Sequence, residues 1–207
     1  MRLLIATTNR DKLREIQSTL TGLQVELLTL ADLPAADEPD ETGTTFAENA
    51  RLKALHYATA AARVIEDPEL VTVAEDSGLV VDALDGEPGV RSARFVRPDA
   101  SYRERFAEIY RRLSSRPARP HTARFICALA AVRGRDVIFE TAGVIEGEIS
   151  REPRGTRGFG YDPIFLYPPY GHTLAEVSDA DKLRVAHRGH AFRRLRSWLE
   201  SSFVSGI

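Results

Sequence analysis

The chain has 207 residues, of which 43% are hydrophobic and 28% charged, and its formal net charge is −2. These values are ordinary for a soluble globular protein and indicate no general attraction to nucleic acid or to an anionic membrane. A single cysteine, Cys127, excludes an intramolecular disulfide, and no apolar stretch approaches the roughly 20 residues of a membrane span. We therefore expect a cytoplasmic protein with no signal peptide and no nucleic-acid or membrane partner.

Strands and helices are predicted to alternate through the first half of the chain. In order, we expect a strand at 2–7, a helix capped by Asn9, a strand at 25–30, a loop at 31–44, a helix from Thr44 or Thr45 to about Ile65, and a strand at 70–74. The last of these strands is followed by Glu75-Asp76-Ser77-Gly78, where we expect the glycine to let the chain turn.

The second half of the chain is predicted to contain a long hairpin. In order, we expect a glycine- and proline-rich loop up to Arg94, a helix at 101–113, strands at 122–132 and 136–149, a loop at 150–163, a strand at 163–167, a short helix capped by Ser178, and a terminal helix at 190–203. This order predicts an α/β fold with a mixed sheet.

Lysine is rare in this chain, which has 25 arginines and three lysines. Lys12, Lys53 and Lys182 each lie in a segment with other residues suited to chemistry. Because most surface positions accept either cation, such lysines indicate sites that need a compact ammonium rather than a planar guanidinium. The alternative is three chance lysines on solvated helix faces.

Two helix starts have features suited to phosphate. Asn9 and Lys12 fall at a helix N-terminus, whose free N–H groups and dipole attract anions, although an ordinary helix cap has the same pattern. Asn49 and Lys53 are spaced i, i+4 on the second helix, so they share one face and can both contact phosphate oxygens.

Acidic residues in two segments are candidate metal ligands. Glu41 precedes the second helix, where it is either a helix-dipole partner or a ligand. Glu75 and Asp76 follow a buried strand, where they suit Mg²⁺ held by one or two carboxylates and substrate phosphates. The alternative for this pair is an acidic turn at the end of the strand.

A glycine-rich segment at 155–163 has an aromatic residue between two glycines, followed by a carboxylate. Such a segment suits the stacking of a flat ring with hydrogen bonds to its edge, or it is simply a hairpin loop. Lys182 and the sequence His187-Arg188-Gly189 follow it along the chain.

Taken together, seven segments resemble the inosine/xanthosine triphosphate pyrophosphatase family, the Ham1- or RdgB-like enzymes. They are Thr8-Asn9-Arg10-Asp11-Lys12, Glu41-Thr42-Gly43, Glu48-Asn49-Ala50, Asp76-Ser77-Gly78, Gly89-Val90-Arg91-Ser92-Ala93-Arg94, Gly158-Phe159-Gly160-Tyr161-Asp162-Pro163 and His187-Arg188-Gly189. Thr8, Arg157 and Ala186 depart from the residues common in the family.

The resemblance implies a Mg²⁺-dependent enzyme that hydrolyses ITP, dITP and XTP to the monophosphate and pyrophosphate. It implies an α/β fold with a long twisted mixed sheet flanked by helices, in one domain whose two lobes surround a central cleft, and a homodimer. Glu41 and Asp76 match the metal ligands, and Asp76 also matches the proposed catalytic base. The substrate-binding residues implied are Thr7, Thr8, Asn9, Lys12, Lys53, Ser77, Phe159, Gly160, Tyr161, Asp162, Lys182, His187 and Arg188.

Three alternatives remain at this point. A Maf-like pyrophosphatase would share the architecture and act on other nucleotides, against which the aromatic loop and His187-Arg188 argue. A nucleotide-binding protein without hydrolysis would not need Lys12, Glu41 and Asp76 together. An RNA-binding module would need a basic stripe, whereas the arginines are spread along the chain and are balanced by 30 acidic residues.

Overall fold

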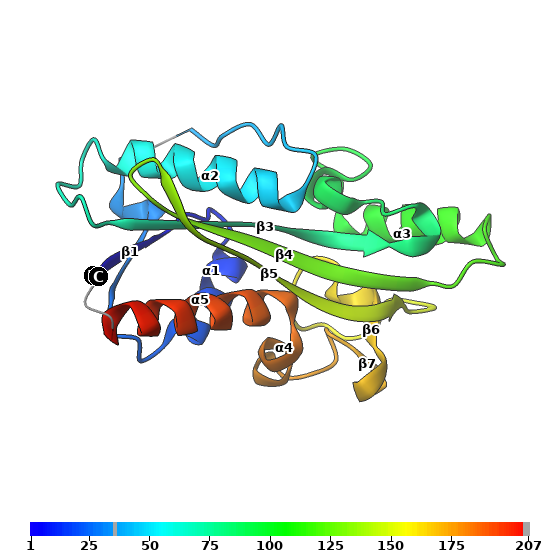
Figure 1. Cartoon of the computed structure of the whole chain (residues 1–207). Coiled ribbons are helices and arrows are strands. Elements are labelled where there is room, and N and C mark those ends of the chain that lie inside the picture. Colours follow the sequence, from blue (N-terminus) through cyan, green and yellow to red (C-terminus); the bar gives the residue numbers. More distant parts are fainter. Residues whose placement is uncertain (35–36, 205–207) are drawn as a thin grey trace. The chain divides into compact units, whose positions relative to one another are not determined.

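The computed structural model describes residues 1–34 and 37–204 (Figure 1). By its internal contacts the chain divides into two compact units. Unit 1 comprises Met1–Asp76, Cys127–Gly143 and Arg188–Ile207, and unit 2 comprises Ser77–Ile126 and Val144–His187. Along the described residues, no helix is both long and apolar enough to cross a membrane.

Seven strands form one sheet in the order β2-β1-β3-β4-β5-β6-β7. The strands are β1 (Arg2–Ile5), β2 (Glu26–Thr29), β3 (Val71–Val81), β4 (Thr122–Arg133), β5 (Asp136–Ile149), β6 (Phe165–Tyr167) and β7 (His172–Thr173). The helices are α1 (Arg10–Leu20), α2 (Phe46–Ala61), α3 (Tyr102–Ser114), α4 (Asp179–Val185) and α5 (His187–Val204). Strand β1 pairs in parallel with β2 and β3, whereas β6 pairs antiparallel with β5 and β7. The predicted mixed α/β sheet is therefore confirmed.

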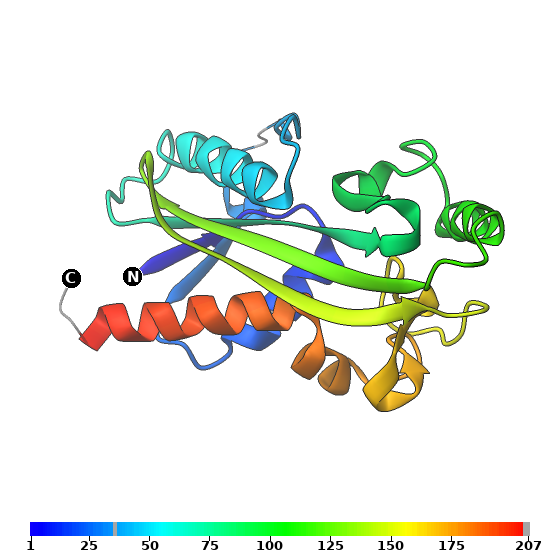
Figure 2. The same ribbon diagram turned by 45° about the vertical axis from the view of Figure 1, so that its right-hand side comes forward.

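In unit 1, helices cover both faces of the strands. Figures 1 and 2 show α2 on one side of β1 and β3 and α5 on the other. Leu3, Ile5 and Val73 belong to the apolar cluster that contains side chains of α1 and α5, whereas Leu4 and Ala74 belong to clusters that contain side chains of α2. This alternation follows from the two-residue period of a strand, and it fixes the face toward which each residue of β3 points.

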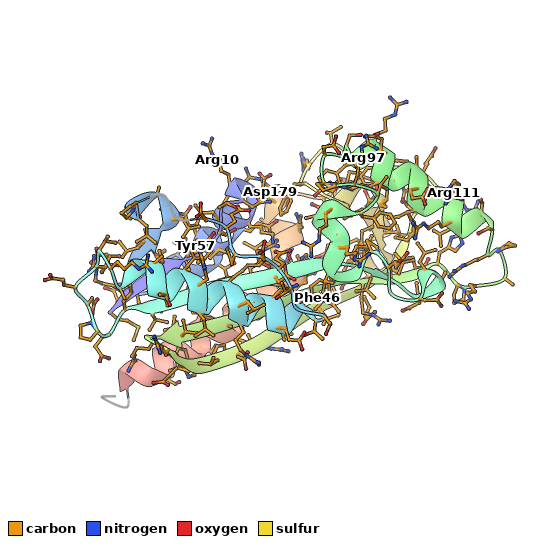
Figure 3. All side chains as sticks on the ribbon, turned by 90° about the horizontal axis from the view of Figure 1, so that it is seen from above. Arg10, Phe46, Tyr57, Arg97, Arg111 and Asp179 are labelled. Atoms are coloured by element: carbon orange, nitrogen blue, oxygen red, sulfur yellow. The ribbon has the colours of Figure 1, made fainter. Side chains whose placement is uncertain are left out.

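In unit 2, α3 packs its apolar side against the sheet. Phe106, Ile109 and Leu113 on this helix belong to one cluster with Leu79 on β3 and Phe125 on β4. The polar side of the same helix includes Arg111. Figure 3 labels this residue, and it also labels Arg97, which precedes the helix. Helix α3 begins with a capping box in which Ser101 and Glu104 satisfy each other's backbone N–H groups.

Several local predictions are confirmed. Asn9, Thr45 and Ser178 cap α1, α2 and α4, and β4 and β5 form the expected hairpin through Gly134, whose φ of 59° is left-handed. In the predicted loop at 31–44, residues 35 and 36 lie outside the described part of the chain, and Leu30–Asp32 form a short 3₁₀ helix.

Other predictions need correction, above all the turn expected at Glu75-Asp76-Ser77-Gly78. Strand β3 runs without interruption from Val71 to Val81, so both acidic residues lie inside a strand. The chain stays extended there because β3 lies between β1 and β4 in the sheet, and its two carboxylates pair with cations on opposite faces. Helix α2 ends at Ala61 rather than Ile65, α5 begins at His187 rather than His190, and the loop before Arg94 contains a 3₁₀ helix, Gly89–Arg94.

Candidate functional site

The first turn of α1 is built around Asn9. Its Oδ1 atom accepts hydrogen bonds from the backbone N–H groups of Asp11 and Lys12, at 2.9 and 3.1 Å, and Thr7 Oγ1 accepts one from the N–H of Asn9. Arg10 in the same turn points outward (Figure 3). The amide of Asn9 therefore acts here as a helix cap, which satisfies N–H groups of the first turn.

Strand β3 sends its two adjacent carboxylates to opposite faces. Because side chains alternate along a strand, Glu75 points to the face covered by α1 and α5, and Asp76 to the face covered by α2. The ion pairs agree with this geometry: Glu75 binds Lys12 of α1, and Asp76 binds Lys53 of α2. The two acids form two separate clusters in place of the single acidic turn expected from the sequence.

On the α2 face, one ammonium joins two carboxylates. Lys53 Nζ lies 2.5 Å from Glu41 Oε1 and 2.9 Å from Asp76 Oδ1. Asn49, one turn earlier on α2, donates from Nδ2 to Asp76 Oδ2 at 3.3 Å, and its Oδ1 accepts from the N–H of Gly43 at 2.8 Å. The i, i+4 spacing of Asn49 and Lys53 places both side chains on one face of α2, as predicted, and there both contact the carboxylate of Asp76. The contacts with phosphate expected from the sequence stay a prediction.

The protonation of this cluster follows from its burial and charges. Burial raises the pKa of Asp76, and although Lys53 acts against this, the negative charges of Glu41 and Glu75 leave the pKa above its ordinary value. Burial alone would lower the pKa of Lys53, but Asp76 and Glu41 outweigh it and raise that pKa. Lys53 is therefore charged at neutral pH, and Asp76 is a more basic carboxylate than an ordinary aspartate.

On the opposite face, Glu75 is the centre of a buried ionic cluster that is not predicted from the sequence. Its Oε1 lies 2.8 Å from Lys12 Nζ and 3.3 Å from Arg188 Nη2, and its Oε2 accepts from the thiol of Cys127. Arg188 also lies 2.6 Å from Glu15. Burial would raise the pKa of Glu75, but the charges of Arg188 and Lys12 hold that pKa well below its ordinary value.

Arg188 was expected to contribute to base recognition, and its substrate role stays a prediction. Its partners here are two carboxylates of unit 1, Glu15 and Glu75. Nothing in the local sequence around Glu15 signals this pairing, because 173 residues separate it from Arg188. For Glu75, the alternation of apolar residues along a continuous strand is the signal that would have placed it on the α1 and α5 face.

The carboxylates on the α2 face are candidate ligands for Mg²⁺. Among the described residues, no group of three or more His, Cys, Asp or Glu side chains is arranged to hold a metal ion. Glu41 and Asp76 nevertheless bring two carboxylate oxygens to one positive centre, the ammonium of Lys53. Two carboxylates with oxygens from substrate and water are a usual environment for Mg²⁺, so these residues fit the ion.

In unit 2, the carboxylate of Asp162 closes the predicted base loop. Its Oδ2 accepts from the backbone N–H of Phe159 at 2.8 Å and lies 2.5 Å from Lys182 Nζ. Lys182 Nζ is also 4.4 Å from the centre of the Phe159 ring, within the range of a cation–π interaction. At Gly158, φ is 69° and an added Cβ would collide with the Asp162 carboxylate, so this tight turn requires glycine.

Other predicted residues have structural surroundings of their own. Tyr161 is buried, and its hydroxyl donates to the carbonyl of Ser92 at 2.8 Å. His187 is buried as well, with its ring stacked 4.9 Å from that of Phe125. Ser77 follows Asp76 within β3, and Thr8 is exposed just before the cap of α1.

A surface pocket of about 410 Å³ lies in unit 1 and is formed by other residues. It is lined by residues of β5 and α5: Phe139, Thr141, His190, Arg193, Arg194 and Ser197. None of the predicted site residues is among them. The carboxylates and ammoniums described above, rather than this pocket, therefore define the candidate site.

Within unit 1 the structure brings together two clusters of predicted residues. They contain Lys53, Glu41 and Asp76 on one face of β3, and Lys12 and Arg188 on the other. Within unit 2 it brings together Phe159, Asp162 and Lys182. One unit thus gathers carboxylates and cations, and the other gathers an aromatic ring and an ion pair.

Comparison with known proteins agrees with these features. The sequence model of the Ham1 family matches residues 3–198. A dITP/XTP pyrophosphatase of Exiguobacterium is 44% identical over 95% of this chain and 96% of its own length, and one of Geobacter sulfurreducens is 44% identical over 96% of each. The solved structure of a HAM1 protein from Coxiella burnetii superposes with a TM-score of 0.87 at 35% identity, covering 97% of this chain and 99% of that one. Since the family's sequence model matches nearly the whole chain, and relatives at 44% identity are covered almost completely, the chain belongs to the Ham1 family.

Proposed function

We propose that this protein hydrolyses non-standard purine nucleoside triphosphates, namely ITP, dITP and XTP, to the monophosphate and pyrophosphate. The names of its relatives support the reaction and the substrate class. The observation that carries the proposal is the convergence of Glu41 and Asp76 on the ammonium of Lys53. That cluster supplies an acceptor of protons, ligands for a divalent cation and a positive charge for phosphate within a few ångströms.

Glu41 and Asp76 would hold Mg²⁺, on which we propose the reaction depends. When bound, the ion supplies positive charge that stabilises charge developing on phosphoryl oxygens. Asp76 would accept a proton from the water that attacks the α-phosphorus, a role suited to a carboxylate whose pKa is raised. Asn49 holds Asp76 through Oδ2, which leaves Oδ1 as the atom shared with Lys53.

Lys53 and Lys12 would bind the triphosphate. Each now pairs with a protein carboxylate, and each would exchange that partner for phosphate oxygens when substrate arrives. Their charges would stabilise the leaving pyrophosphate by electrostatics and positioning, with no covalent intermediate. An ammonium suits this exchange because it is a point charge on a flexible stem.

Phe159 and the residues near it would select the base. Hypoxanthine and xanthine have a 6-keto acceptor and an N1–H donor, whereas adenine has a 6-amino donor and a bare N1. Donors such as Lys182 or His187 would form hydrogen bonds with the keto oxygen. With adenine in the site these donors would have no acceptor, which would cost about 1–3 kcal/mol of binding free energy per buried group. Two or three such mismatches give a discrimination of several powers of ten.

Further properties of the protein are proposed from the family resemblance. They are one functional domain formed by both units, a central cleft, a homodimer, and a cytoplasmic location where nucleotides are made and used. Removal of deaminated purines before polymerases use them would be the biological role.

The proposal is tested by a panel of nucleoside triphosphates with detection of released pyrophosphate, with and without Mg²⁺. We expect rapid turnover of ITP, dITP and XTP, slow turnover of ATP, dTTP and UTP, and none after chelation of the metal. A clear preference for pyrimidine nucleotides would instead favour a Maf-like enzyme. Tight nucleotide binding without pyrophosphate release would favour a binding protein.

A further inference from the structure

The first turn of α3 packs against the predicted base loop. Within unit 2, the rings of Tyr102 and Tyr161 meet edge to face with centroids 5.3 Å apart, and Phe106 lies 6.0 Å from the same Tyr161 ring. Such edge-to-face aromatic contacts add specific geometry to the area they bury. Tyr161 directly precedes Asp162, the residue that ties Phe159 to Lys182.

The backbone of the loop is close to Tyr102 as well. Gly160 has a φ of 65°, and a Cβ added there would lie 3.5 Å from the Tyr102 hydroxyl oxygen. Tyr161 is fixed from another direction by the hydrogen bond from its hydroxyl to the carbonyl of Ser92. The loop is therefore supported at Tyr161 by the ring of Tyr102, which leaves little room beyond the backbone of Gly160.

Arg105 packs against Tyr102 and connects it to the segment before α3. It is 5% exposed, and it donates from Nε to the carbonyl of Phe95 at 3.3 Å and from Nη2 to that of Pro98 at 3.2 Å. Its guanidinium lies 4.8 Å from the centre of the Tyr102 ring. Of the interactions described for Arg105, none is with a carboxylate.

A buried cation held by carbonyls and a ring costs free energy unless its hydrogen bonds are retained. A guanidinium can bridge two carbonyls and stack on a ring at the same time, whereas an ammonium cannot. The placement of Arg105 thus links the segment before α3 to the ring that supports the base loop.

We propose that Tyr102 and Arg105 are positioning residues that set purine selectivity by fixing the loop that contains Phe159 and Asp162. This inference rests on the proposed function, because it concerns the base of the same substrate. Displacement of Tyr161 would move Asp162, and with it both the Phe159 N–H and the Lys182 ammonium. A misplacement of about 1 Å is enough to change catalytic efficiency a hundredfold, so a small shift of the loop would be measurable.

The test compares Tyr102→Ala with two matched controls, Tyr102→Phe and Arg103→Ala. Tyr102→Phe keeps the ring, and Arg103 is an exposed arginine in the same turn. For Tyr102→Ala we expect KM for ITP to rise about tenfold with kcat nearly unchanged, and kcat/KM for ATP to stay the same, so that discrimination falls about tenfold. Both controls should keep the wild-type discrimination.

Arg105→Met removes the donors and keeps the apolar stem, and it should have the same kinetic effect as Tyr102→Ala. Tyr102 is on the surface, so Tyr102→Ala should fold. Its kinetics therefore test the inference even if Arg105→Met unfolds. A merely structural role would lower the thermal midpoint and reduce turnover of ITP and ATP in equal proportion. That result, or wild-type kinetics for Tyr102→Ala, would overturn the inference and leave the proposed function intact. Failure of the wild-type protein to release pyrophosphate from ITP would overturn both.

Discussion

The ion pairs of the two units differ in how open they are to solvent. In unit 1, the side chains of Lys53 and Glu41 are 16% and 24% exposed, whereas in unit 2 those of Lys182 and Asp162 are each 4% exposed. An open pair can exchange its partner for a metal ion or a phosphate. A closed pair is held by its surroundings and fixes the groups around it.

The same difference occurs across strand β3 within unit 1. Glu75 and Arg188 are each 2% exposed, so this pair is closed, although Glu75 and Asp76 are neighbours in sequence. Lys12, which binds the same carboxylate, is 19% exposed and is open to exchange. Removal of one member of a buried ion pair leaves the other charge buried without compensation, which strongly destabilises the fold. The comparison therefore predicts that changes in the open cluster affect activity, and that changes in the two closed pairs, Glu75 with Arg188 and Asp162 with Lys182, affect stability or positioning.

The largest effect on activity is expected for Asp76→Asn. Loss of a general base lowers turnover by about 10²–10⁴-fold. The amide has nearly the same shape, and Lys53 keeps Glu41 as its partner, so nucleotide binding and the thermal midpoint should change little. Steady-state pyrophosphate release and nucleotide titration would be measured side by side. Glu140→Gln, at an exposed acid paired with Arg51, serves as the control. Near-normal turnover of Asp76→Asn would rule out the role given to this carboxylate.

Glu75→Gln should have the largest effect on stability. Removal of its charge leaves Lys12 and Arg188 facing a neutral amide in a buried site, and we expect the free energy of unfolding to fall by about 3–5 kcal/mol. Urea denaturation measures this change. Glu69→Gln breaks an exposed pair with Arg133 and should cost at most about 1 kcal/mol. Equal losses in the two variants would contradict the distinction between closed and open pairs.

A smaller effect is expected for Lys53→Arg, which preserves charge and changes its shape. The planar guanidinium cannot occupy the point between Glu41 and Asp76 as an ammonium does, and kcat/KM should fall about tenfold, or about 1.4 kcal/mol. Arg51→Lys, on an exposed position of the same helix, is the matched control and should behave as the wild type. Unchanged kinetics of Lys53→Arg would show that only charge matters at this site.

The pH dependence of stability sharpens the comparison further. The pKa of Glu75 is held below its ordinary value of 4.5, so its stabilising contribution is fully present above that pH and is lost as the pH falls toward the folded-state pKa. Below pH 4.5 the wild-type unfolding free energy should therefore fall more steeply than that of Glu75→Gln, by up to about 1.4 kcal/mol per pH unit. Denaturation curves measured from pH 3 to pH 6 would compare the two slopes, and parallel curves would exclude the ionised state assigned to Glu75.

Features that depend on neighbours in sequence could be predicted before the structure was known. The caps Asn9 and Thr45 and the shared helix face of Asn49 and Lys53 follow from helix geometry alone. The carboxylate of Asp76 that both side chains contact lies on another element and was not predicted as their partner. The family motifs added Glu41 and Asp76.

Features that depend on distant segments could not be predicted in the same way. Glu15 and Arg188 are far apart in the sequence, and only the packing of α1 and α5 on one face brings them together. The error at Glu75 came from interpreting Ser77-Gly78 as a turn, whereas β3 continues through these residues between β1 and β4 in the sheet. Tyr102 and Arg105 have no motif, and their place beside the base loop is visible only in the folded chain.

The most direct test of the open cluster as the hydrolytic centre is turnover of ITP in ¹⁸O-labelled water with Mg²⁺. If Asp76 directs water to the α-phosphorus, mass spectrometry will find one labelled oxygen in the inosine monophosphate and none in the pyrophosphate. Label in the pyrophosphate, or release of orthophosphate with a nucleoside diphosphate, would show attack at another phosphorus and contradict the proposed roles of Glu41, Lys53 and Asp76.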